Sequence, residues 1–220
     1  DAAIEKNDAV IEMTKQLKKS LMQQLLTKGI GHKKFKKTKV GEIPVNWKVQ
    51  PLIDTATLQR GIDLPEKQRT PGTIPIFGSN GILGHHNYAP FHTSGVITGR
   101  SGSIGFVYYS DGPYWPLNTT LHVIDFHGNS PKFIALLLEA LRLERFIAST
   151  GVPSLNRNFI HPILVPVPPV DEQNEIAYII GWIVNQVSKE EACKQRLEQL
   201  KKALLQVLLT GKLRIQIIKE

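Results

Sequence analysis

An eleven-residue sequence occurs twice in this chain, once near each end. Residues 17–27 read LKKSLMQQLLT and residues 200–210 read LKKALLQVLLT, with eight of the eleven positions identical. Each copy is followed by a lysine and a glycine, in one order or the other. Two unrelated amphipathic helices could share leucines, but they would hardly share the lysine pair, the glutamine and the threonine in register. The chain therefore carries two equivalent helices around a central domain, and equivalent helices favour equivalent packing.

The C-terminal copy belongs to a longer segment with helical spacing. This segment follows Pro168-Pro169, with Asp171 as the expected N-cap and Glu172 in the first turn, where an acid suits the helix dipole. Two heptad seams can be drawn along it, formed by Ile176, Ile183, Glu190, Leu197 and Leu204 and by Ile179, Gln186, Cys193, Leu200 and Val207. The pattern predicts a long helix that pairs with another helix, although packing on its own domain would leave a similar stripe. The polar Gln186 and Glu190 would set the register or mark a change of partner.

Composition changes near residues 40 and 170, and these changes predict three regions. They are a helix with a basic linker (1–39), a central domain (40–170) and a long C-terminal helix (171–220). The central region is rich in Gly, Pro, aromatic and β-branched residues, and it predicts strands at 48–52, 74–77, 95–98, 105–109, 121–124 and 163–167. A helix is expected from Ser130-Pro131 to about Ser149, with Gly151 as its stop. The expected fold is α+β, a strand-rich mixed α/β domain flanked by long helices.

The net charge of +8 suggests a nucleic-acid partner, but its distribution limits where the contact can be. Residues 1–39 carry +6, whereas residues 40–170 and 171–220 carry +1 each. Any contact between the central domain and DNA must therefore come from locally placed cations.

Several classes of protein are disfavoured by the sequence. No apolar run approaches the roughly 18 residues of a membrane helix, and the single cysteine, Cys193, cannot form an internal disulfide. No Cys/His spacing typical of zinc and no arrangement typical of a hydrolase, a nuclease or an amino-methyltransferase is present. We expect a soluble cytoplasmic protein without catalytic residues, metal or cofactor. The chain starts at Asp1 and not at methionine, so it can also be part of a longer chain.

The glycine-rich segment from Gly99 to Gly105 has three interpretations. It follows a predicted strand, as a phosphate-binding loop would, but its spacing is neither G-x-G-x-x-G nor a P-loop, and another strand follows it. It could instead be the turn of a β-hairpin, with glycines at positive φ. The third interpretation is a loop that presents Arg100, Ser101 and Ser103 to DNA.

Three further polar segments carry candidate DNA contacts, although ordinary surface turns would give similar sequences. Asparagine and histidine can hydrogen-bond base edges, and arginine and lysine can contact phosphates. The candidates are Arg60, Lys67 and Arg69 between the first two strands, Ser79 and Asn80 with His85 and His86 beyond them, and Ser154, Asn156 and Arg157 in the segment 150–158. The lysine-rich run 33–39 is either a solvated linker or a contact for phosphate or an acidic partner.

Taken in order, several segments resemble the specificity subunits of type I restriction-modification systems. They are residues 39–44 (KVGEIP) followed by Trp47, residues 76–81 (IFGSNG), residues 96–105 (VITGRSGSIG), and residues 165–173 (VPVPPVDEQ) before a helix that closes with residues 208–212 (LLTGK). The resemblance implies that the centre is a target-recognition domain that reads one half of a split DNA target. It implies that the helices form an antiparallel coiled coil that docks methyltransferase subunits. Methyl transfer from S-adenosylmethionine and ATP-driven cleavage would then belong to the methyltransferase and restriction subunits.

One departure from this family concerns the number of recognition domains. Members commonly carry two in one chain, whereas this sequence shows one between two copies of the closing helix. We expect a half-subunit that forms a homodimer through its long helices, although half of a longer chain would have the same sequence. Two other functions remain open at this point: a nucleotide-dependent enzyme that uses residues 99–105, and a coiled-coil scaffold that does not read DNA.

Overall fold

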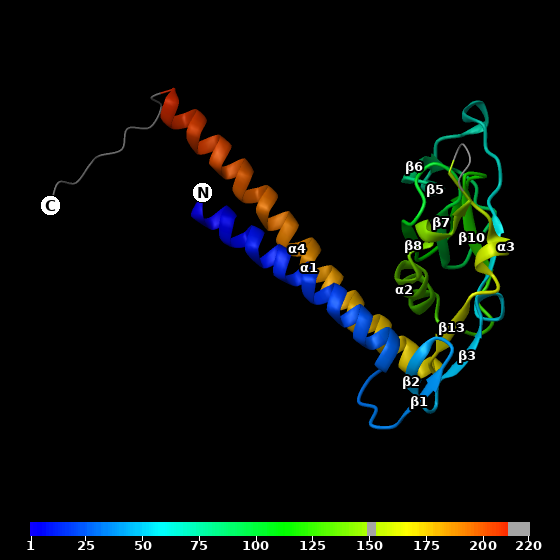
Figure 1. Ribbon diagram of the computed structural model, residues 1–220. Coiled ribbons are helices and arrows are strands. Elements are labelled where there is room, and N and C mark those ends of the chain that lie inside the picture. The colour runs from blue at the N-terminus through cyan, green and yellow to red at the C-terminus, as the bar shows by residue number, and fades with distance from the viewer. Residues whose placement is uncertain (149–152, 211–220) are drawn as a thin grey trace. The chain divides into compact units, whose positions relative to one another are not determined.

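The computed structural model describes residues 1–148 and 153–210 and divides into two compact units. Unit one comprises residues 1–21 and the chain from residue 179 onward, and unit two comprises residues 22–178. Two long helices, α1 (Ala2–Lys28) and α4 (Val170–Leu209), contribute residues to both units (Figure 1). No helix among the described residues is long and apolar enough to cross a membrane.

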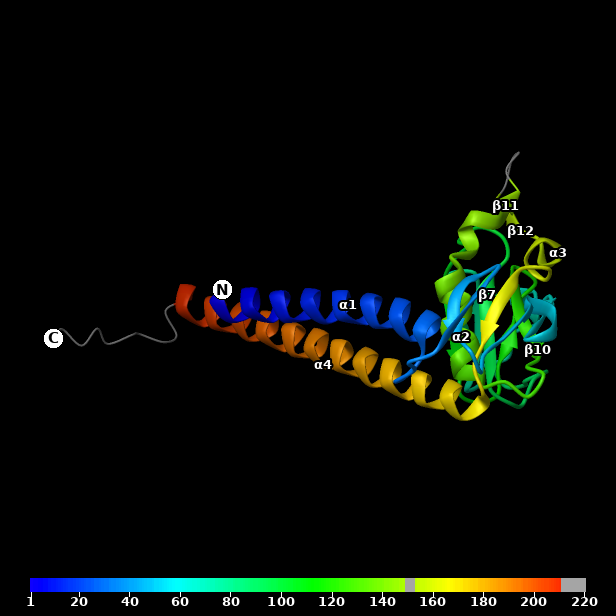
Figure 2. The ribbon, with the colours of Figure 1, turned by 60° about the horizontal axis from the view of Figure 1, so that its bottom comes forward.

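In unit one, α1 and α4 lie side by side and run in opposite directions (Figures 1 and 2). Asn7 Nδ2 donates to Glu190 Oε2 at 2.7 Å, and Lys194 Nζ lies 2.7 Å from Asp8 Oδ1. Two other ion pairs join Lys15 to Glu191 and Lys201 to Asp1. The flanking helices therefore form an antiparallel pair within one chain.

The seam of this pair follows the alternating three- and four-residue spacing of a coiled coil. Its buried and half-buried positions are Ile4, Asn7, Ile11, Thr14, Lys18 and Leu21 on α1, and Ile180, Ile183, Val187, Glu190, Lys194 and Leu197 on α4. The first predicted seam on α4 agrees with this set at Ile183, Glu190 and Leu197, and Ile176 is likewise buried in unit two.

The second predicted seam is displaced by one residue from the side of α4 that faces α1. Ile180, Val187 and Lys194 occupy the seam, whereas Ile179 and Gln186 are half-buried beside it and Cys193 is exposed. The predicted seam followed Cys193 and did not include Lys194, whose ammonium pairs with Asp8 and Glu198 while its methylene stem can cover the seam. Of the remaining predicted pairing residues, Leu200 (56%) and Leu204 (51%) are exposed and Val207 is half-buried.

The two copies of the repeat end in the same way. The hydroxyl of Thr27 donates to the carbonyl of Gln23 at 2.6 Å, and the hydroxyl of Thr210 donates to that of Gln206 at the same distance. In each copy the threonine side chain thus binds a carbonyl in the last turn of a helix. The prediction that both copies are helical is confirmed.

Unit two contains several short sheets, in which most strand pairs are antiparallel. The largest has the strand order β4-β10-β7-β8, formed by Thr57–Arg60, Thr120–Asp125, Gly95–Gly99 and Val107–Ser110. A second has the order β6-β5-β9, formed by Gly81–His86, Ile74–Gly78 and Trp115–Pro116, and its β5–β9 pairing is parallel. The remaining strands form the pairs β1–β2 (Phe35–Thr38, Gly41–Pro44), β3–β13 (Lys48–Pro51, Leu164–Val167) and β11–β12 (Ile147–Ala148, Ser154–Leu155).

The six predicted strands are all present within two residues of their predicted bounds, as β3, β5, β7, β8, β10 and β13. The basic run, in contrast, is not a plain linker. Its residues Phe35–Thr38 form β1, and Lys36 Nζ donates to the carbonyls of Val45 (2.9 Å) and Trp47 (2.7 Å). A lysine side chain can thus bind backbone carbonyls and hold a charged segment in a hairpin.

Helix α2 (Pro131–Leu141) contacts β7 and β8 and buries Phe133, Ile134, Leu137 and Leu138. It ends eight residues before the predicted bound at Ser149, because Arg142 takes the left-handed conformation (φ 53°) and Leu143 turns into the core. A 3-10 turn, η3 (Leu143–Phe146), follows. The predicted stop at Gly151 lies outside the described residues.

The first turn of α4 is joined to the end of α1 through Glu172. Its carboxylate accepts hydrogen bonds from the backbone N–H of Ile30 (3.1 Å) and from Trp47 Nε1 (2.9 Å), and it lies 2.7 Å from His32 Nε2. The Glu172 side chain is 12% exposed, and Trp47 is 1% exposed. A half-buried carboxylate with three partners fixes the three segments that supply them.

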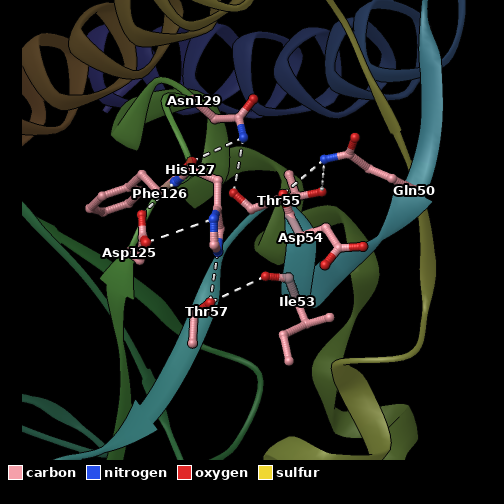
Figure 3. A network of polar contacts seen from close by, with 9 residues as sticks. All are labelled: Gln50, Ile53, Asp54, Thr55, Thr57, Asp125, Phe126, His127 and Asn129. Atoms are coloured by element: carbon pink, nitrogen blue, oxygen red, sulfur yellow. Dashed lines mark hydrogen bonds and ion pairs between the residues drawn. The ribbon is translucent and has the colours of Figure 1, made fainter.

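The next residue, Gln173, joins α4 to the segment before α2. Gln173 is fully buried, and its Nε2 donates to Asn129 Oδ1 at 2.7 Å while its Oε1 accepts from the N–H of Ser130 at 2.9 Å. Asn129 continues the chain of contacts by donating to the carbonyl of Thr55 at 3.0 Å, in the network shown in Figure 3. In that network His127 Nε2 also lies 2.8 Å from Thr57 Oγ1. The base of β4 is thus linked to α4.

Replacing the carboxylate should therefore destabilise unit two. In Glu172→Gln, the amide nitrogen faces groups that are themselves donors, and we expect a loss of about 2–3 kcal/mol in the free energy of unfolding, measured by urea denaturation. Glu175→Gln, an exposed site one turn along the same helix, is the control and should change it by less than about 0.5 kcal/mol. Equal effects of the two substitutions would contradict this role of Glu172.

A buried histidine lies in the four-stranded sheet of unit two. His122 on β10 is 1% exposed, its Nδ1 lies 3.1 Å from the hydroxyl of Tyr114, and its ring centroid lies 4.4 Å from that of Phe91. Burial lowers the pKa of His122 from 6.5 to about 4, and burial also raises the pKa of Tyr114. The imidazole is therefore uncharged at neutral pH and can accept a hydrogen bond from the phenol.

Because the folded pKa of His122 is lower than the unfolded value, the fold should weaken as the pH falls from about 6.5 to about 4. We expect the difference in unfolding free energy between wild type and His122→Gln to shrink over this range by up to about 3 kcal/mol. Urea denaturation at a series of pH values measures it. Val123→Ala, a buried change at the next residue of β10, should show a difference that does not depend on pH.

Candidate nucleic-acid interface

Two of the predicted DNA-contacting segments, distant in sequence, meet at one end of unit two. The backbone N–H of Arg100 donates to the carbonyl of Thr119 at 2.8 Å, and the N–H of Leu155 donates to the carbonyl of Arg100 at 2.7 Å. Ser101 and Ser154 form an antiparallel bridge. The connection after β7 is thus held between β12 and the turn that precedes β10. The predicted residues 150–152 lie outside the described part of the chain.

The turn between β5 and β6 joins the same group. A Cβ placed on Gly102 would lie 3.4 Å from Ser79 Oγ, an ordinary van der Waals distance, so the two turns lie next to each other. Gly102 also has a positive φ of 82°, which glycine tolerates best. Ser79 is half-buried by this contact, whereas its neighbour Asn80 is exposed.

Arg60 reaches this group from the end of β4. Its Nε donates to the carbonyl of Asn118 at 3.2 Å, and Asn118 Nδ2 donates to Asp63 Oδ1 at 2.8 Å. Asn118 immediately precedes Thr119, whose carbonyl holds the backbone of Arg100. Sequence reasoning missed Asp63, Asn118 and Thr119, because nothing in the local sequence shows that this turn lies between two arginines.

Arg157 belongs to a short helix, α3 (Arg157–Ile160), that covers the open edge of β4. Its Nη1 donates to the carbonyl of Leu58 at 3.3 Å, and the N–H of Leu58 donates to His161 Nε2 at 3.1 Å. Burial lowers the pKa of His161, and the charge of Arg157 adds to that effect, so this histidine is a neutral acceptor. Asn156 caps the helix by accepting from the N–H of Asn158 at 3.0 Å. The edge strand is therefore blocked against pairing with another chain.

We call these residues the loop cluster. It contains Arg60, Ser79, Asn80, Arg100, Ser101, Ser103, Ser154, Asn156 and Arg157. Figure 2 shows β11, β12 and α3 gathered at this end of unit two. Segments that carry three arginines and several hydroxyl and amide groups meet here in a nearly neutral region, and such groups suit a phosphate backbone with exposed base edges.

The four other candidate residues lie at the opposite end of the β5–β6 hairpin. Register places His86 opposite Ile74, whereas Gly81 and Gly78 flank the turn that joins the loop cluster. His86 is 6% exposed, and its Nδ1 lies 3.0 Å from the N–H of Thr70. The prediction that His86 is an exposed base-reading residue is therefore not supported, because its ring is used inside the fold.

The neighbours of His86 differ in exposure. Arg69 is half-buried, and its Nε donates to the carbonyl of Leu64 at 3.3 Å. Lys67 and His85 are exposed. These two side chains remain candidates for DNA contacts outside the loop cluster.

The segment 99–105 is a β-hairpin connection, as one of its three interpretations predicted. Residues on either side pair in antiparallel register, with Thr98 opposite Val107, and no helix follows. The N–H groups of Arg100 and Ser101 both point to the carbonyl of Thr119, so they are not available to a phosphate group of a nucleotide. No group of three or more His, Cys, Asp or Glu side chains that could hold a metal occurs among residues 1–148 and 153–210.

Comparison with known proteins agrees with this fold. The chain has a TM-score of 0.70 to a type I restriction-modification S subunit from M. genitalium, at 16% identity, covering 93% of this chain and 56% of that one. The HsdS subunit from Thermoanaerobacter tengcongensis gives a TM-score of 0.63 at 14% identity, covering 96% and 56%. An α+β unit between two long helices is therefore the fold of type I specificity subunits.

Residues 44–199 match the family described as the type I restriction modification DNA specificity domain. The chain belongs to this family. It is 26% identical to the type I restriction enzyme MjaVIII specificity subunit of Methanocaldococcus jannaschii, and the match covers 94% of this chain and 56% of that protein. The chain spans about half the length of the curated relatives that it matches. These matches agree with the prediction of a specificity subunit and not of a catalytic chain.

The geometry predicts different results for two arginines of the loop cluster. Arg100→Ala should weaken binding to duplex DNA while changing the free energy of unfolding by less than about 0.5 kcal/mol, because the backbone of Arg100 holds the loop. Arg157→Ala should also cost about 1 kcal/mol of stability, because the carbonyl of Leu58 loses its donor. Fluorescence anisotropy and urea denaturation measure the two effects, with Lys189→Ala, an exposed lysine of α4, as the control outside the cluster. Binding by Arg100→Ala at wild-type affinity would argue against the loop cluster as the DNA contact.

Proposed function

We propose that this chain is a half-length specificity subunit that reads one half of a bipartite DNA target and docks methyltransferase subunits beside it. The observation that carries the proposal is the meeting of three arginine-bearing segments at the loop cluster in a member of the specificity family. The relatives are about twice as long as this chain, and one recognition unit accounts for one half of a split target.

Burial of the two repeat copies supports an assembly role for the C-terminal copy. In the first copy Met22, Leu25 and Leu26 are 8%, 6% and 5% exposed. The equivalent residues of the second copy, Leu205, Leu208 and Leu209, are 47%, 41% and 84% exposed. The same sequence is therefore buried at one end of the chain and exposed at the other, and we propose that a second copy of the chain covers the exposed one.

The outer surface of the helical pair supplies a further surface for assembly. Four exposed residues flank the seam, and they are Val10 and Leu17 on α1 and Trp182 and Leu200 on α4. When each helix is viewed from its own N-terminus, these residues lie on the same side of its seam. Because the two helices face each other and run in opposite directions, these two flanks lie on the same side of the pair. The predicted pairing residues Ile179, Leu200, Leu204 and Val207 belong to this flank or border it.

We assign the two ends of this side to different partners. The C-terminal leucines would form a two-fold homodimer, and Trp182 with Val10 and Leu17 would contact the methyltransferase subunits. The restriction subunit would join through them, acting on DNA in the cytoplasm. Methyl transfer, ATP hydrolysis and their cofactors then belong to the partner subunits, and this chain supplies recognition and spacing.

The test is a map of DNA methylation. The chain is co-expressed with a cognate methyltransferase subunit in a host lacking other adenine methylation, and methylated adenines are located by single-molecule sequencing. We expect a bipartite motif with a spacer of fixed length, and a homodimer predicts that its two halves are the same sequence in inverted orientation. A methylated motif whose two halves differ in sequence would instead show that a second recognition domain completes the subunit.

Variants separate recognition from assembly. Arg60→Ala with Arg100→Ala should reduce methylation while the methyltransferase still co-purifies. Leu204→Asp with Leu208→Asp should reduce the mass of the complex measured by light scattering, because charges would enter the proposed leucine interface. Co-purification without any sequence preference would favour a scaffold that does not read DNA and would contradict the proposed function.

A further inference from the structure

Helix α2 ends on an unusual residue. Arg142 has φ 53° and ψ 66°, the left-handed region, and His127 is the other non-glycine residue with positive φ among those described. Helices commonly end with glycine in this conformation, because a Cβ makes it unfavourable. The turn itself is needed, since it directs the fully buried Leu143 into the core. The conformation thus serves the fold, but it would suit glycine better than arginine.

Folding does not explain the side chain. The turn is held by backbone hydrogen bonds, from the N–H of Arg142 to the carbonyl of Glu139 (3.3 Å) and from the N–H of Arg145 to the carbonyl of Arg142 (3.0 Å). The Arg142 side chain is 68% exposed, and its Nε lies 3.9 Å from Glu144 Oε1, which belongs to a side chain 48% exposed. An exposed ion pair at this distance adds little stability. A strained residue whose side chain contributes little to folding indicates a function.

The position of this turn suggests the function. A Cβ placed on Gly105 would come within 2.7 Å of Glu144 Oε2, so the partner of Arg142 lies against the end of the segment 99–105. The 3-10 turn η3 that follows Arg142 contacts both β12 and α3. Those elements carry Ser154 and Arg157 of the loop cluster. Arg142 is therefore at the border of the cluster, on an element that the sequence had assigned to the interior of a helix.

We infer that Arg142 is a fourth cation of the DNA interface and that it binds a phosphate of the duplex. A guanidinium presents two parallel donors to phosphate oxygens and remains charged at any physiological pH. The exposed guanidinium would exchange its long contact with Glu144 (Nε to Oε1, 3.9 Å) for the phosphate. This inference rests on the proposed function, because it assumes that the loop cluster faces DNA.

The experiment compares three substitutions at one position in the full chain. Arg142→Gly and Arg142→Asn remove the charge and tolerate the left-handed conformation, whereas Arg142→Lys keeps the charge and the strain. The probe is a fluorescein-labelled 30-base-pair duplex of mixed sequence, titrated at several KCl concentrations between 50 and 200 mM. We expect Arg142→Gly and Arg142→Asn to bind on the order of fivefold more weakly and to lower the slope of log affinity against log salt by about 0.9.

Stability should change in the opposite direction. The melting temperature of Arg142→Gly should rise by about 1–3 °C, because a strained residue is relieved. Arg142→Lys should keep the wild-type melting temperature and salt slope and lose less affinity than Arg142→Gly, because it keeps the charge but not the two parallel donors. Arg196→Gln on α4 controls for loss of one charge and should leave affinity and slope unchanged. If the wild-type chain binds and Arg142→Gly binds equally well with the same slope, the inference is wrong and the proposed function stands. If the wild-type chain binds no duplex at 50 mM KCl, the proposed function fails and this assignment fails with it.

Discussion

The carboxylate of Glu172 is the contact on which the arrangement of unit two depends. It lies in the first turn of α4, where the helix dipole favours a negative charge, and it accepts hydrogen bonds from residues that follow α1 and from Trp47. Gly29 is fitted to this contact in two ways. Its φ is +64°, and a Cβ there would collide with Glu172, His32 and Trp47. The close approach of α1 to α4 therefore requires a glycine next to a carboxylate.

Gln173 lies in the same first turn of α4, but its side chain contacts a different segment of unit two. It donates to Asn129, which in turn donates to the carbonyl of Thr55 (Figure 3). Thr55 lies just before β4, whose far end carries Arg60. Two successive polar side chains thus join α4 to two different segments. The carboxylate of Glu172 contacts the segment after α1 and Trp47, and the amide of Gln173 contacts the segment before α2. An amide has both donors and an acceptor, so Gln173 can bind a backbone N–H and two oxygens at once while fully buried.

Much of the fold could be predicted from the sequence, and the reason is local. Strands such as β7 and β10 are mostly buried runs rich in β-branched residues between turn residues, and the helices repeat an amphipathic pattern. The seam on α4 was partly missed because Lys194 is half-buried there although it is charged. Hairpin β1–β2 was missed because a lysine-rich strand depends on the carbonyls that Lys36 binds. In both cases a charged residue has a structural role that hydropathy does not show.

The candidate site was predicted as separate loops, and its assembly could not be. The segments of Arg100 and Ser154 come together through backbone pairing that no complementary pattern in the sequence indicates, and Ser79 lies beside Gly102 of the same connection. His86 was assigned wrongly because a histidine beside a turn has the same local sequence whether its ring points outward or binds Thr70. Arg142 was missed for the opposite reason, since the sequence predicted a helix that continues through it.

The way in which the loops are held has a consequence for specificity. Arg100 is fixed by its own N–H and carbonyl, and Ser101 pairs with Ser154 through the backbone. Backbone hydrogen bonds do not depend on which side chain is attached, so residues at these positions can change while the loop keeps its path. The interior beneath them, by contrast, is close-packed around Ile97 and Tyr114, where a change of volume is costly. Under the proposed function, a unit built in this way could acquire a new DNA target through surface substitutions while its helices and interior contacts stay the same.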